Sequence, residues 1–253
     1  NWANFSFPYF HGQFYGFADA CRLAAIAFTF TRQWKWVALF LMGGFMIHPI
    51  KMLVACFFIL GVAFCDRRHS LNKISFGWGS VTSAFFCLWA YFWLGLGQGN
   101  ESIHVSIDEF VAYSRIFQVH WYPLDNGLFT FNHDRVLTPF MGLMLMTMLA
   151  LSQNQWPQHR INQFLLGLAA LMIVSFIGLW VSFDQSSITL IRVCLLRATA
   201  LVTLLAPVII LSAVLVKWKE GQWQWIAIYA VFLFGGFEII KYVNMSPVLA
   251  LMA

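Results

Sequence analysis

The sequence predicts an all-α protein, a polytopic bundle of membrane helices that forms a single domain over residues 1–253. Hydrophobic residues make up 60% of the chain and charged residues only 10%, whereas about a quarter of the residues in a soluble domain are charged. Aromatic residues reach 18%, and large rings suit lipid-facing surfaces and membrane interfaces. About eight apolar segments follow one another along the chain. We therefore take the net charge of +5 as an indication of which loops face the cytoplasm. We expect membrane lipids and no nucleic acid as partners.

The first apolar segment, Phe14–Phe30, carries two charged residues, Asp19 and Arg22. They are three positions apart, so on a helix they share a face, and an ion pair between them is the simplest interpretation. A charge at membrane depth is costly and usually faces protein or a water-filled cavity.

The next two segments, Trp36–Ile47 and Pro49–Cys65, are short for membrane spans. Joined through His48-Pro49 they would form one helix of about thirty residues, which is too long to cross a membrane without strong tilt. We predict instead that His48-Pro49 is the tip of a hairpin made by two short helices.

The distribution of Lys and Arg favours the hairpin. With a turn at His48-Pro49, the most basic short connections all fall on one side, which is cytoplasmic by the positive-inside rule. The tip, with Lys51, then faces the extracytoplasmic side. The basic residues that gather on the cytoplasmic side are Arg32, Lys35, Arg67, Arg68, Lys73, Arg160, Lys217 and Lys219.

The segment Phe76–Leu96 leads into a long loop, residues 97–134, on the predicted extracytoplasmic side. Ser106 and Glu109 have the spacing of a helix-capping box, and apolar residues with helical spacing surround and follow them. We expect a short amphipathic helix at the outer membrane–water interface, with Asp108 and Glu109 as candidate catalytic carboxylates. A structural lid without a catalytic role is the alternative.

Histidines flank the turn-rich part of this loop: His120 on one side and His133-Asp134 on the other. Histidine and aspartate are good ligands for divalent ions. Their spacing matches no known ligand pattern, so we interpret them as solvated loop residues and assign no metal site.

Four apolar segments follow: Val136–Leu151, Ile161–Phe183, Ile188–Leu215 and Trp223–Ile240. The third contains Arg192 and Arg197, which lie roughly 140° apart around a helix because they are five residues apart. Such deep arginines need anionic partners. Asp184 or Glu109 could pair with them, and so could the phosphate of a lipid, which guanidinium binds bidentately. Asp184 lies in a short outer loop and is a third candidate catalytic carboxylate.

Several stretches resemble the GT-C-type, multi-spanning glycosyltransferase-like proteins of bacteria. They are the arginine-bearing run "RLAAIAFTFTRQWKWVALFLMGGFMIHPIKML" with its His-Pro tip, "VHWYP" in the long loop, and the late helix "LIRVCLLRATALV". The resemblance covers most of the chain, although each motif is short. It implies a multi-pass protein of the bacterial inner membrane.

The resemblance also implies a reaction on the extracytoplasmic face, in which a sugar passes from a polyprenyl-phosphate carrier to an acceptor. The lipid-linked sugar is the substrate, and no other cofactor is expected. A carboxylate would act as general base and cations would offset charge on the phosphate. We expect the phosphate near Arg192, Arg197, His48, Lys51 and His120.

One departure from the family concerns the catalytic acid. In these proteins it usually lies in the first outer loop, whereas this chain has no acidic residue before Asp19. The chain opens with "NWANFSFPYF" like the middle of a longer protein. Either the base lies in residues beyond this sequence, or the protein is a non-catalytic relative. The alternatives to an enzyme are an integral subunit of a larger membrane complex and, third, a transporter.

Overall fold

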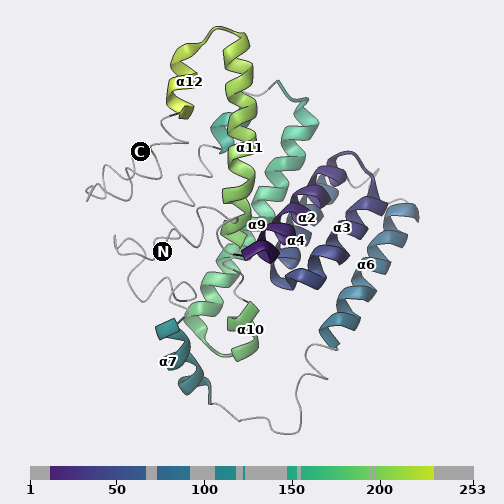
Figure 1. Ribbon diagram of the computed structural model, residues 1–253, viewed down its shortest axis with the longest axis vertical. Helices are drawn as coiled ribbons and strands as arrows, with labels where there is room; N and C mark the ends of the chain where they lie inside the picture. The colour runs from purple at the N-terminus through teal and green to yellow at the C-terminus, as the bar shows by residue number, and fades with distance from the viewer. Residues whose placement is uncertain are drawn as a thin grey trace.

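The computed structural model describes residues 12–66, 73–91, 106–117, 122, 147–152, 155–193, 195 and 198–230. Over these residues the regular structure is helical and there is no β-strand, which confirms the all-α class. Figure 1 shows long helices side by side, with two shorter helices, α7 and α10, at one end. The helices are α2 (Gly12–Phe30), α3 (Trp34–Ile47), α4 (Pro49–Cys65), α6 (Lys73–Tyr91), α7 (Ile107–Phe117), α9 (Gln158–Asp184), α10 (Ile188–Val193), α11 (Ala198–Lys219) and α12 (Trp223–Ala230).

The predicted turn at His48-Pro49 is present. His48 has an extended backbone, with φ −152° and ψ 90°, and separates α3 from α4. Proline at the first position of α4 fits because it has no N–H to leave unpaired and its φ already suits a helix. The two helices contact each other, as the hairpin requires.

The later segments differ from the prediction in one place. The sequence predicts a continuous helix over 188–215, whereas α10 ends at Val193, Leu195 lies in a 3₁₀ turn, and α11 begins at Ala198. The apolar residues in this stretch cover every face, so periodicity alone does not reveal an interruption. Most of 136–151 and of 231–240 lies outside the described residues.

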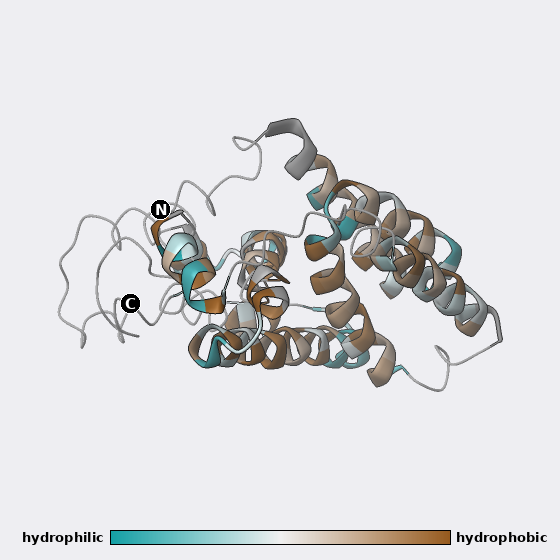
Figure 2. Cartoon of the chain, turned by 90° about the horizontal axis from the view of Figure 1, so that it is seen from below, coloured by the Kyte–Doolittle hydropathy of each residue, from teal (hydrophilic) through white to brown (hydrophobic). Residues whose placement is uncertain are grey.

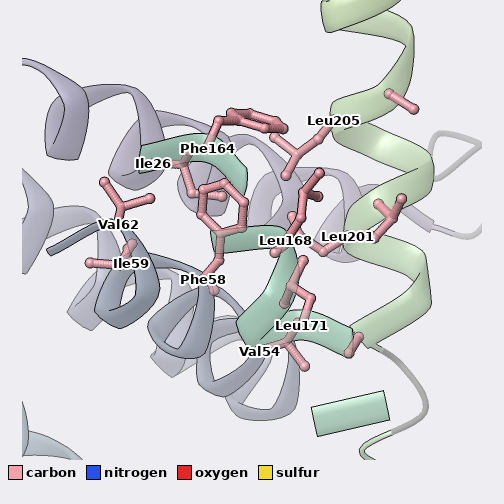
Figure 3. Packing of buried hydrophobic residues seen from close by; sticks show 14 of the residues in the cluster. Ile26, Val54, Phe58, Ile59, Val62, Phe164, Leu168, Leu171, Leu201 and Leu205 are labelled. Atoms are coloured by element: carbon pink, nitrogen blue, oxygen red, sulfur yellow. The ribbon is translucent and has the colours of Figure 1, made fainter. Parts of the chain in front are cut away.

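The core forms where α4 packs along α9 and both contact α11. Figure 3 shows Phe58 of α4 among Phe164, Leu168 and Leu171 of α9, with Leu201 of α11 beside them. All five side chains are buried. Their burial removes apolar surface from water or lipid and fixes the centre of the bundle.

Hydrogen bonds tie the basic connections together at one end of the bundle. Arg32 Nε donates to Asp66 Oδ2 at 2.7 Å, and the Arg160 guanidinium bonds the carbonyl of Phe30. Gln155 Nε2 donates to Glu220 Oε1 at 3.2 Å. We call this the basic end; Lys35, Lys217 and Lys219 also belong to it through the helices they occupy.

The opposite end carries His48 and Lys51 and is called the tip end. Because α9 begins at the basic end and α4 finishes there, the two helices run antiparallel, and Asp184 at the close of α9 lies toward the tip end. The grouping of Arg32, Lys35, Arg160, Lys217 and Lys219 follows the sequence prediction, whereas Arg67 and Arg68 lie outside the described residues. The side of a membrane on which they lie stays a prediction.

Two of the described helices are long and apolar enough to cross a membrane, namely α9 (Gln158–Asp184) and residues Ala200–Lys219 of α11. Apolar residues dominate most of the bundle (Figure 2). The helices α3 and α4 are apolar but span only 14 and 17 residues. The other spans among the eight expected therefore stay predictions.

Candidate functional site

Three charged side chains meet inside the bundle near the tip end. Asp19 Oδ1 accepts from Arg22 Nη2 at 2.9 Å, which confirms the predicted pair. The ammonium of Lys51 reaches the same carboxylate from α4 and lies 2.9 Å from each of its oxygens. The Asp19, Arg22 and Lys51 side chains are only 5%, 2% and 14% exposed. We call these three residues the tip cluster.

The tip cluster joins three helices. Asp19 and Arg22 come from α2 and Lys51 from the first turn of α4, while Arg22 Nη2 also approaches the carbonyl of Ala200 in α11 at 3.5 Å. Arg22 is the largest of the fully buried side chains among the described residues. A buried guanidinium shared by several helices fixes their positions relative to one another, because charged hydrogen bonds are strong and directional.

His48 acts at the same place as the N-cap of α4. Its Nδ1 accepts from the backbone N–H of Lys51 at 3.4 Å. This satisfies one of the donors that a helix leaves open at its start. His48 therefore has a structural role here, and its predicted contact with a substrate stays a hypothesis.

The remaining predicted phosphate-binding residues divide as follows. Arg192 lies within α10, and its side chain is outside the described part of the structure. Arg197 and His120 are outside the described residues as well, as is His133-Asp134. Of the predicted set, His48 and Lys51 are thus the two that the described structure brings together.

The three candidate carboxylates occupy exposed positions toward the tip end. Asp108 and Glu109 lie in the first turn of α7, and Asp184 is the last residue of α9. The helix α7 is held there by a small apolar cluster of Val111, Tyr122 and Ile191, against which Val181 of α9 packs. The carboxylate within the tip cluster, however, is Asp19, which is not one of these three candidates.

The predicted capping box of α7 is confirmed. Glu109 Oε2 accepts from the Ser106 backbone N–H at 3.0 Å and from its hydroxyl at 2.9 Å. Glu109 N–H in turn donates to the Ser106 hydroxyl at 3.2 Å. The bond from the Ser106 backbone N–H has the larger effect and that from its hydroxyl the smaller, and both hold the pKa of Glu109 below its usual value.

Acidification is expected to loosen the start of α7. The pKa of Glu109 is lower in the folded than in the unfolded chain. The stability that its carboxylate contributes is therefore fully present above the unfolded-state pKa, and it is lost as the pH falls through the folded-state pKa. Amide hydrogen exchange at 106–109, corrected for its intrinsic pH dependence, should therefore speed up in acid. Glu109→Gln should remove this pH response. The same response in that variant would assign the effect to another group.

The sequence contains one signal for the tip cluster that our prediction does not use. Asp19 is the first acidic residue of the chain, and the next is Asp66. A lysine in the first turn of an apolar helix needs an anion, so Lys51 has Asp19 as its natural partner. The prediction of Lys51 as a phosphate ligand does not take this pair into account, and it stays a prediction.

Metal binding finds no support within the described residues, where no three His, Cys, Asp or Glu side chains gather closely enough to hold an ion. No protein-family model, no curated protein and no solved structure matches this chain.

Proposed function

We propose that this chain is an integral membrane protein that handles a polyprenyl-phosphate-linked sugar at the extracytoplasmic end of its helical bundle. The proposal takes the tip end as extracytoplasmic. The observation that carries it is the tip cluster, which places two cations, Arg22 and Lys51, inside a largely apolar bundle near a hairpin tip. Ionisable groups in such positions are generally functional because their burial is costly.

The outward faces of the two longest apolar helices support a membrane location. In α9 the exposed residues Ile173, Phe176, Trp180 and Phe183 recur at helical spacing, each more than 60% exposed. In α11 the residues Val208, Leu211, Leu215 and Trp218 repeat the same spacing and are more than half exposed. A soluble core helix would bury such stripes, whereas lipid covers them.

The proposed reaction is transfer of the sugar from the carrier phosphate to an acceptor hydroxyl. The acceptor oxygen bonds to the anomeric carbon while the bond from that carbon to the phosphate oxygen breaks. A carboxylate takes the acceptor proton, and a cation offsets the charge on the released phosphate. Lys51, the most exposed member of the tip cluster, suits the last role. Asp108, Glu109 and Asp184 stay candidates for the base.

A transfer assay tests the proposal. The purified chain in lipid vesicles is given a polyprenyl-phosphate-linked radiolabelled hexose and a mixture of free sugars and glycerol as acceptor alcohols, and release of label from the lipid is followed. We expect release above that of empty vesicles, at least tenfold slower in Lys51→Gln. Lys35→Gln, at the basic end, is the matched control and should release label normally. Release no faster than from empty vesicles would reject the enzyme.

A second function, a non-catalytic subunit of a larger membrane complex, is favoured by a different observation. In the described structure Asp19 is engaged by two cations and Glu109 by its capping box, so neither is a free base. The helix α6 packs on α3 and exposes Phe76, Leu88 and Tyr91 on its other side, which would suit a neighbouring protein. A complex larger than the single chain, after mild extraction from its native membrane, would support this function.

A further inference from the structure

The Nε–H of Arg22 is a buried donor for which the described residues offer no acceptor. Its side chain is 2% exposed, and Nη2 bonds Asp19 and approaches the carbonyl of Ala200. The Nε–H is buried and makes no hydrogen bond with the part of the chain that the structure describes. Buried polar groups nearly always have partners, so a buried charged donor without an acceptor among the described residues is a candidate contact for a ligand.

The surroundings of this donor favour an anion. Arg22 and Lys51 bring two positive charges to one place, and Asp19 lies between them. A phosphate oxygen accepts charge-assisted hydrogen bonds, and the planar guanidinium fork matches phosphate geometry better than a lysine does.

The ligand would enter from the tip end. The Lys51 side chain is 14% exposed, so it is the member of the tip cluster that solvent reaches most easily. The first turn of α4, a helix of 17 residues capped by His48, lies beside it. The positive end of the helix dipole adds to the attraction for an anion.

We infer that the tip cluster is a phosphate-binding site in which the Nε–H of Arg22 is the donor kept for the ligand. The inference rests on the proposed function, and it moves the main phosphate contact from Arg192 and Arg197 to Arg22. Lys51 is shared between Asp19 and the phosphate. The same chemistry would bind a lipid phosphate headgroup or free phosphate, so the test has an arm for each.

The test follows the full chain in phosphatidylcholine nanodiscs, with ¹⁵N-labelled arginine, by the NMR signals of arginine Nε–H groups. A long-chain polyprenyl phosphate is added in one arm and inorganic phosphate in the other. We expect one Nε–H signal to shift on addition of the lipid, and that signal to be absent from Arg22→Lys. The affinity for the lipid should fall at least tenfold in Arg22→Lys.

Arg32→Lys is the matched control. It makes the same change at the basic end, where Arg32 Nε already bonds Asp66 and its side chain is 42% exposed. Its affinity for polyprenyl phosphate should stay within twofold of the unmodified chain. If Arg22→Lys does not fold, Lys51→Gln replaces it, and its affinity for polyprenyl phosphate should also fall at least tenfold. The shift of an Nε–H signal in the unmodified chain is measured without any variant.

The outcomes separate the site from the proposed function. Lipid binding that persists at full affinity in Arg22→Lys overturns the site and leaves the proposed function standing. Binding of inorganic phosphate alone, lost in Arg22→Lys, supports the site and rejects the lipid carrier. A chain that binds neither compound overturns both.

Discussion

Replacing Asp19 by alanine is expected to destabilise the folded chain by about 3–5 kcal/mol, the usual cost of removing one partner of a buried ion pair. The variant leaves Arg22 and Lys51 inside the bundle without the carboxylate that they share at 2.9 Å. The cost arises mainly from Arg22, because its side chain is the more deeply buried of the two. Thermal unfolding in detergent, with denaturant titration for the free energy, measures the loss.

Two further variants establish the cause of that loss. Asp66→Ala removes the partner of Arg32, whose side chain is 42% exposed. Exposed ion pairs contribute about 0.2–1 kcal/mol, so this variant should lose much less stability than Asp19→Ala. A triple variant, Asp19→Ala with Arg22→Met and Lys51→Met, removes the cations together with the anion and should be more stable than Asp19→Ala alone. Equal instability of the triple and the single variant would show that packing around Asp19, and not the charge, causes the loss.

The sequence predicts local features of the helices best. Both ends of α4 are predicted, because proline marks the first turn and the polar Asp66 follows the last apolar residue. The capping box of α7 is equally local, and the structure contains its reciprocal bonds. Signals of this kind depend on residues within one turn of each other.

What the sequence does not predict depends on contacts between distant segments. The bond from Lys51 to Asp19 spans 32 positions, and the approach of Arg22 to Ala200 spans 178. Neither follows from periodicity. Periodicity also does not predict that α10 and α11 are separate helices, because a stretch that is apolar on all faces shows no periodic pattern that could change where a helix ends. The sequence prediction therefore relies on Arg192 and Arg197 for the phosphate, whereas our proposal from the structure relies on Arg22; the prediction for Arg192 and Arg197 stays untested.

The centre of the bundle depends on how closely α4 and α9 approach, because their contact forms part of the hydrophobic core. A Cβ added at Gly61 would lie 2.5 Å from the carbonyl oxygen of Leu166 and 3.0 Å from Cα of Gly167. The obstacle is backbone, which cannot rotate away as a side chain can. Close contact of these two helices therefore requires glycine at 61.

Gly61→Ala is expected to push α4 away from α9 and to cost about 1–3 kcal/mol, the typical penalty for overpacking a dense core. Gly43→Ala in α3 is the control, because a Cβ there meets nothing within 4 Å. That variant should gain about 0.5–1 kcal/mol from the better helix propensity of alanine. Unfolding of both variants under identical detergent conditions gives the comparison. Gly61→Ala as stable as Gly43→Ala would mean that the backbones of α4 and α9 are not in close contact at Gly61.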